Sequence, residues 1–144
     1  MTKVLCLNGP NLNMLGLREP RIYGVKSYLD LEEHIRKVSE ELGLETEVEQ
    51  TNFEGTLVSW IQEARGKFDW IILNAGAYTH TSIAILDAIK ASEVPTVEVH
   101  LTDPMQREEF RHISYVGMAS EKTFKGEGFD SYTQALVWIR SKEA

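Results

Sequence analysis

The chain has 144 residues, with 15 Lys and Arg against 22 Asp and Glu, which gives a formal net charge of −7. With 42% apolar and 26% charged residues, the composition excludes a disordered or fibrous chain, and the length predicts a single domain over residues 1–144. A general nucleic-acid binder is also excluded, because neutralising phosphates needs a basic face.

Cysteine usage and hydropathy predict where the protein works. The single cysteine, Cys6, leaves the chain without an internal disulfide or a cysteine-based metal site, as is usual in a reducing compartment. The longest apolar runs, 4–7 and 70–73, have four residues each, far fewer than the ~18 needed to cross a bilayer. We therefore expect a cytoplasmic protein that does not bind membranes.

The first third of the chain predicts a strand, a helix and a second strand. Residues 3–7 are almost continuously apolar, as in a central parallel strand covered on both faces. Apolar residues then recur at helical spacing over 28–42, with Ser27 suited to cap the start and Gly43 the end. Residues 44–50 alternate apolar or Thr side chains with glutamates, which predicts an edge strand with one wet face.

The rest of the chain continues this alternation of strands and amphipathic helices. In order, the predicted elements are a helix over 57–64 that stops at Gly66, a strand over 70–73, a helix over 82–92, a strand over 96–101, a strand over 122–125, and a helix that begins with Asp130 as its cap. This order is typical of an α/β protein with a parallel sheet.

The edge position of the second strand predicts the strand order. With right-handed crossovers, the order 2-1-3-4-5 follows, which is a flavodoxin-like, three-layer α/β/α fold around a five-stranded parallel sheet. In such sheets ligands bind outside the carboxyl ends of the strands. Candidate functional residues are therefore sought there.

The first strand leads into a segment with the features of a lid. Residues 8–13 contain three asparagines around a Gly-Pro turn, and the segment 14–24 follows. Gly16 and Gly24 bracket two arginines and a tyrosine as hinges would. A surface loop with solvated charges is the alternative, and the residues of this loop alone leave both interpretations open.

The third and fourth strands also end in polar residues. Segment 74–82 is a polar, Gly-containing turn into a helix, where backbone N–H groups favour an anionic or oxygen-rich ligand, although its hydroxyls also suit simple helix caps. On the fourth strand, Glu98 and His100 point to the same side, so the carboxylate can orient the imidazole for acid–base chemistry. Segment 107–112 is interpreted as a charged helical turn.

Several functional motifs are missing from the sequence. It contains no GxGxxG, GxxxxGK[ST] or GxSxG, and Asn8 and Asn74 stand where receiver domains need acidic residues. No histidine and carboxylate cluster has the spacing of a catalytic metal site, so no metal is expected. Amides, two histidines, arginines and a tyrosine together indicate a small polyhydroxylated anion that undergoes proton transfer without a cofactor.

These residues resemble one enzyme family over nearly the whole chain. The matching segments, in chain order, are 8–13, 18–20, 22–24, 54–55, 77–82, 87–88, 98–101, 107–108 and 110–111. Each is short, but their order and spacing together resemble type II 3-dehydroquinate dehydratase. The resemblance implies an anti elimination of water from 3-dehydroquinate to 3-dehydroshikimate through an enolate, in the shikimate pathway or in quinate breakdown, with no cofactor.

The resemblance also implies catalytic roles. Tyr23 is the base that removes a proton from C2, and Arg18 favours its tyrosinate form by positive charge. His100 protonates the departing C1 hydroxyl, with Glu98 behind it. Asn11 helps to hold a water at the enolate oxygen.

Further roles concern substrate binding and assembly. By resemblance, Asn74, Leu101 and Thr102 hold the substrate carboxylate, whereas Arg111 and His80 bind the ring hydroxyls. Asp87 corresponds to a residue that a neighbouring subunit contributes. The family typically forms homododecamers, arranged as tetramers of trimers.

The sequence departs from the family pattern at a few positions. Ala75 replaces a common proline, Leu17 a common threonine, and Lys122 a glycine before the last strand. Asp103 adds a negative charge that would weaken substrate binding if it pointed into the carboxylate pocket. Two alternatives remain: a non-enzymatic flavodoxin-like binding or signalling module, and the same fold acting on another sugar acid.

Overall fold

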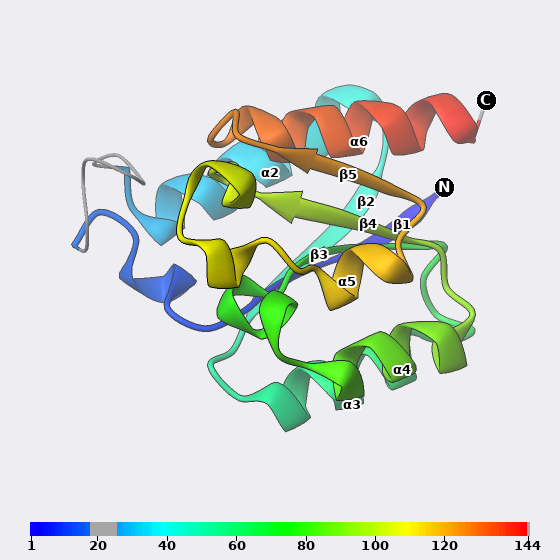
Figure 1. Ribbon diagram of the computed structural model, residues 1–144. Helices are drawn as coiled ribbons and strands as arrows, with labels where there is room; N and C mark the ends of the chain where they lie inside the picture. The colour runs from blue at the N-terminus through cyan, green and yellow to red at the C-terminus, as the bar shows by residue number, and fades with distance from the viewer. Residues whose placement is uncertain (18–25, 144) are drawn as a thin grey trace.

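The computed structural model describes residues 1–17 and 26–143, and in these residues five parallel strands form the middle layer (Figure 1). Their order is β2-β1-β3-β4-β5, which confirms the predicted flavodoxin-like arrangement. The strands are β1 (Lys3–Asn8), β2 (Glu45–Gln50), β3 (Trp70–Asn74), β4 (Thr96–His100) and β5 (Lys122–Lys125).

Helices cover both faces of this sheet. On one face lie α2 (Tyr28–Leu42) and α6 (Asp130–Lys142), which pack against each other (Figure 1). On the other face lie α3 (Glu54–Ala64), α4 (Ile83–Ser92) and the short α5 (Tyr115–Met118). Each face has its own apolar cluster, so the sheet is sandwiched between two cores. No helix in the described ranges is long and apolar enough to span a membrane.

Two strands are longer than predicted, and the extra residues are polar. β1 extends to Asn8 and β3 to Asn74, and these two asparagines pair with each other in register. Both side chains are buried, although asparagine is rare in strand interiors. The pairing of β1 with β3 therefore places two side-chain amides at the carboxyl-terminal end of the sheet.

The predicted helix boundaries are largely confirmed. Ser27 and Asp30 form a reciprocal capping box at the start of α2, and Gly43 ends it with φ of 71°. The prediction for Asp130 is wrong: Phe129 occupies the N-cap position of α6 without a side-chain bond, and Asp130 is the first helical residue. Its carboxylate still lies in the first turn, where a negative charge is favourable.

The last strand forms despite its unusual first residue. Lys122 is exposed and pairs in register with Val97, and the pairing continues to His100 and Lys125. A side chain at position 122 is therefore compatible with β5.

Candidate active site

A pocket of about 270 Å³ opens at the carboxyl ends of β1, β3 and β4. Its position is the one that the parallel sheet predicts for a ligand site. Seven of the predicted site residues line it: Asn11, Asn74, His80, His100, Leu101, Thr102 and Arg111. Apolar side chains from the segment after β1, among them Leu12 and Leu15, complete the wall.

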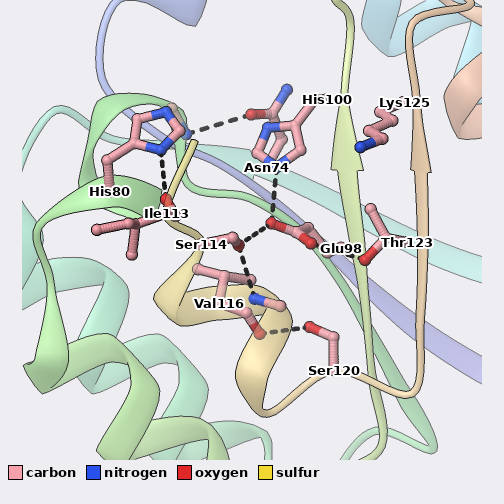
Figure 2. Close-up of polar contacts among 12 residues, drawn as sticks. Asn74, His80, Glu98, His100, Ile113, Ser114, Val116, Ser120, Thr123 and Lys125 are labelled. Atoms are coloured by element: carbon pink, nitrogen blue, oxygen red, sulfur yellow. Dashed lines mark hydrogen bonds and ion pairs between the residues drawn. The ribbon is translucent and has the colours of Figure 1, made fainter. Parts of the chain in front are cut away.

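His100 and Glu98 form a buried pair at the end of β4. Nε2 of His100 lies 2.7 Å from Oε2 of Glu98, and the two residues are only 8% and 2% exposed. Figure 2 shows the imidazole joined to the carboxylate behind it. Because an ionised carboxylate only accepts hydrogen bonds, the proton of the neutral ring sits on Nε2. Nδ1 is then the nitrogen left to exchange a proton with a ligand.

Glu98 remains a carboxylate in spite of its burial. Burial by itself raises the pKa of the Glu98 carboxyl, but the hydrogen bond and charge of His100, with bonds from Ser114 and Thr123, outweigh it and hold the pKa below its usual value. The charge of Glu98 offsets the positive charge that His100 carries when it acts as an acid.

His80 has the opposite ring orientation. Its Nδ1 lies 2.7 Å from the backbone carbonyl of Ile113, and since a carbonyl only accepts, Nδ1 carries the proton (Figure 2). Burial lowers the pKa of His80, and the nearby His100 and Arg111 lower it further, against the raising effect of the Ile113 carbonyl and Glu98. His80 is therefore neutral near pH 7, with Nε2 free to accept a bond from a ligand hydroxyl.

Hydrogen bonds through the sheet orient the amide of Asn74. The Tyr132 hydroxyl on α6 donates to Oδ1 of Asn8 at 2.6 Å, so it accepts from Nδ2 of Asn74 at 2.9 Å. Oδ1 of Asn74 accepts from the Gly76 N–H at 3.2 Å. Tyr132 thus takes one N–H of the Asn74 amide and Gly76 bonds its oxygen. The second N–H of Asn74 is the one available to an anionic group in the pocket.

Two arginines follow β4 and make the pocket cationic. Arg107 and Arg111 both line it, and each side chain is largely buried near the Glu108 carboxylate, with Nε atoms at 3.8 and 3.0 Å. No Asp or Glu is among the described residues that line the pocket. A chain of net charge −7 thus presents a local cationic site, suited to an anionic ligand.

Comparison with known proteins agrees with this geometry. A family model described as Dehydroquinase class II matches residues 2–140. The chain belongs to this family. A 3-dehydroquinate dehydratase 1 from Corynebacterium efficiens is 50% identical over 93% of this chain and 89% of its own length. A catabolic 3-dehydroquinase 1 from Fusarium vanettenii is 47% identical over 92% of each chain.

Solved structures show the same family likeness. The crystal structure of type II dehydroquinase from Propionibacterium acnes has a TM-score of 0.94 and 40% identity, and the match covers 98% of this chain and 97% of that one. The resemblance stated from the sequence motifs is thereby confirmed. In this dehydroquinase chain, the pocket at the strand ends is the candidate active site.

Four predicted site residues are not among the described residues that line this pocket. Arg18 and Tyr23 lie outside the described residues. Asp87 is exposed on α4 and is not among the described residues that line the pocket. Glu98 is also not part of the pocket lining, because it lies behind His100.

The structure also shows where Asp103 points. Its carboxylate accepts a hydrogen bond from the Met105 N–H at 3.0 Å and lies 3.4 Å from Nζ of Lys125. Asp103 is not among the residues that line the pocket. The added negative charge is therefore paired with a lysine of β5 and does not oppose an anionic ligand directly.

Arg107 is a pocket residue that the sequence interpretation missed. The sequence alone favours a charged helical turn over 107–112, a segment that contains two arginines and two glutamates. The signal that was available is the spacing of Arg107 and Arg111, which follow the carboxyl end of a central strand by a few residues. Two short 3₁₀ turns, Pro104–Gln106 and Glu109–Arg111, place both side chains against the pocket.

Removing the Tyr132 hydroxyl tests the buried network that orients Asn74. We expect Tyr132→Phe to lower the free energy of unfolding by about 1–3 kcal/mol, because buried polar atoms of Asn8 and Asn74 each lose a partner. Urea denaturation measures the change. Tyr28→Phe is the matched control, since its hydroxyl bonds Asn8 at 3.4 Å and is half-buried, so its loss should cost less. Equal losses of stability in the two variants would contradict the role of the Tyr132 hydroxyl in this network.

Proposed function

We propose that this dehydroquinase eliminates water from 3-dehydroquinate to form 3-dehydroshikimate, and that it is therefore a hydro-lyase. The observation that carries the proposal is the pocket itself: an imidazole backed by a buried carboxylate stands beside arginines, amides and a neutral histidine, with no carboxylate among the described residues of the wall. This set suits a polyhydroxylated carboxylate that must gain and lose protons.

The groups of the pocket divide between binding and acid catalysis. Asn74, the N–H groups of Leu101 and Thr102, and the Thr102 hydroxyl hold the substrate carboxylate, and Arg111 and Nε2 of His80 take the ring hydroxyls. His100 donates its Nδ1 proton to the departing C1 hydroxyl, which leaves as water. The support for this step is the bond from Nε2 to Glu98, which leaves Nδ1 as the exchanging nitrogen.

The proton removed from C2 goes to Tyr23, on the evidence of the family motif. A free tyrosine has a pKa of about 10, so Arg18 is needed to favour the tyrosinate. The enolate forms as the C2 proton leaves, with a water held by Asn11 at its oxygen. After water departs, Tyr23 holds one extra proton and His100 lacks one, and their exchange with solvent restores the starting state.

Turnover of 3-dehydroquinate tests this function directly. The product is a conjugated enone that absorbs in the ultraviolet, whereas the substrate does not. We expect a steady rise in absorbance with the purified protein. Binding without turnover would favour a non-enzymatic module, and turnover of a different sugar acid alone would mean that the fold serves another substrate.

We further propose that the working unit is a homododecamer of four trimers, in which Asp87 reaches the active site of a neighbouring subunit. Asp87 and Ile83 lie one turn apart on the exposed face of α4, and Ile83 is 53% exposed. Met118, on the adjacent α5, is 62% exposed. Apolar side chains beside an exposed carboxylate suit a subunit contact that also delivers a charge.

A mixing experiment tests whether Asp87 acts across subunits. We expect co-assembled Asp87→Asn and His100→Ala chains to regain about a quarter of the wild-type activity, since one site in four then draws both intact groups from different chains. Each variant alone should be far less active. Absence of recovery in confirmed mixed oligomers would place Asp87 outside the neighbour's site.

Two roles in metabolism fit this activity. The product serves either aromatic biosynthesis through the shikimate pathway or the breakdown of quinate. We place the enzyme in the cytoplasm, because its single cysteine, Cys6, is buried and free, as is common in reducing compartments.

A further inference from the structure

The Glu98 carboxylate receives hydrogen bonds from three different elements. His100 Nε2, on β4, bonds Oε2 at 2.7 Å, and the Thr123 hydroxyl, on β5, bonds Oε1 at 2.7 Å. The Ser114 hydroxyl, which precedes α5, also bonds Oε2. Figure 2 shows these three bonds converging on the carboxylate behind the imidazole. Two hydroxyls therefore bond the same group that holds His100.

The direction of the Ser114 bond follows from its second partner. Ser114 is the N-cap of α5, and its hydroxyl oxygen accepts from the Gly117 N–H at 2.8 Å. The single hydroxyl proton is then directed to Glu98. Every bond given above for Glu98 is thus one that it accepts, which is the state of an ionised carboxylate.

Close packing of α5 holds this arrangement in place. A Cβ at Gly117 would lie 2.9 Å from Oε1 of Glu98 and 3.0 Å from the Ser114 hydroxyl oxygen, so only glycine leaves room for the carboxylate. Glu98 is consequently confined between β5 and the first turn of α5. Because the Glu98 carboxylate is confined and accepts the hydrogen bonds named above, it holds the His100 ring in one orientation.

Ile113, the residue before Ser114, bonds the second histidine of the pocket, His80. Ile113 accepts the Nδ1 proton of His80 at 2.7 Å, whereas Ser114 bonds the carboxylate that accepts the Nε2 proton of His100. Of two consecutive residues, Ile113 thus bonds one histidine directly and Ser114 bonds the carboxylate that holds the other. His80 presents Nε2 to the pocket, whereas His100 presents Nδ1.

We propose that Ser114 and Thr123 are positioning residues for acid catalysis: by donating to Glu98, their hydroxyls keep His100 in the tautomer that presents Nδ1 to the departing hydroxyl. The inference rests on the proposed function for its kinetic consequence, but the tautomer itself is independent of substrate. Neither Ser114 nor Thr123 is among the described residues that line the pocket, so both hydroxyls act through Glu98 and His100.

Kinetics of hydroxyl-deletion variants provide the first test. We expect Thr123→Val and Ser114→Ala each to lower kcat for 3-dehydroquinate about tenfold, with KM nearly unchanged, because a bond to a charged group is lost. Ser120→Ala is the matched control, since its hydroxyl donates to the Val116 carbonyl at 2.7 Å next to α5 and should leave kcat unchanged. Thr123→Val leaves the α5 cap intact, so it remains informative if Ser114→Ala fails to fold.

A double-mutant cycle separates positioning from general loss of structure. In a His100→Ala background, Thr123→Val should cause no further loss of the residual rate, because the group through which Thr123 acts is gone. A further tenfold loss there, or an equal loss in Ser120→Ala, would overturn the proposal.

Nitrogen-15 spectra of the histidine rings provide a test that needs no turnover. We expect wild-type His100 to show a protonated Nε2 and the Ser114→Ala, Thr123→Val double variant to show a mixture of tautomers. An unchanged His100 signal in the double variant would overturn the proposal. If wild-type protein fails to turn over 3-dehydroquinate, the proposed function falls, whereas this spectral result still decides the role of the two hydroxyls.

Discussion

Replacing His100 with alanine is expected to lower kcat by about 10²–10⁴-fold, the usual contribution of a positioned general acid. The imidazole lines the pocket at the end of β4, and its Nε2 is bonded to Glu98, so Nδ1 is the nitrogen that remains to protonate the leaving hydroxyl. Without the ring, the hydroxyl must leave from the enolate without protonation. KM should change much less, since Asn74, His80 and Arg111 remain.

The stability of the His100→Ala variant must be measured together with its kcat. Removal of the ring leaves Glu98 buried with only its two hydroxyl partners, which costs about 1–3 kcal/mol of stability. His34→Ala is the matched control, because His34 lies on α2 and bonds Thr133. A folded His100→Ala protein with near wild-type kcat would refute the acid role.

Tyr23→Phe is expected to reduce kcat by a similar factor, because the variant lacks the oxygen that accepts the C2 proton. The change removes one atom, so substrate binding and KM should be largely retained. Steady-state assays with 3-dehydroquinate measure both constants. Loss of the proton acceptor should also abolish exchange of the C2 proton with deuterium in the solvent.

The exchange measurement distinguishes the base from the acid. His100→Ala should still exchange the C2 proton, since Tyr23 is intact and only the expulsion of the hydroxyl is slowed. Tyr115→Phe, on α5 and outside the pocket lining, is the control for the loss of a phenol oxygen. Normal turnover by Tyr23→Phe would assign proton removal to another group.

The fold was predictable from short stretches of sequence because its determinants are local. The glutamates that alternate along 44–50 mark an edge strand, and the strand order follows from that edge and the handedness of crossovers. Ser27 and Gly43 cap the two ends of α2, and each acts on helix residues that are close to it in the sequence. At Asp130 the same reasoning failed, because the chain turns into α6 one residue earlier than the cap rule expects.

Much of the site was also visible in the sequence, since parallel strands bring their carboxyl ends to one edge. The turn after β3 and the pair Glu98 and His100 were identified by position alone, and the pocket brings His80 and His100 together. Arg107 was missed, because a charged turn exposed to solvent and one folded over a pocket have the same residue pattern. Only the path of the chain after β4 distinguishes them.

The sequence by itself determined the layers, the strand order and the family, because these depend on hydropathy periods and on motifs within short windows. The tertiary structure alone decided which nitrogen His80 presents, where the Asp103 charge points, and which way the Asn74 amide is turned. Each of these depends on a partner far along the chain: Ile113 for His80, Lys125 for Asp103 and Tyr132 for Asn74. Hydrogen bonds depend on distance and angle, and no local pattern encodes a contact across the fold.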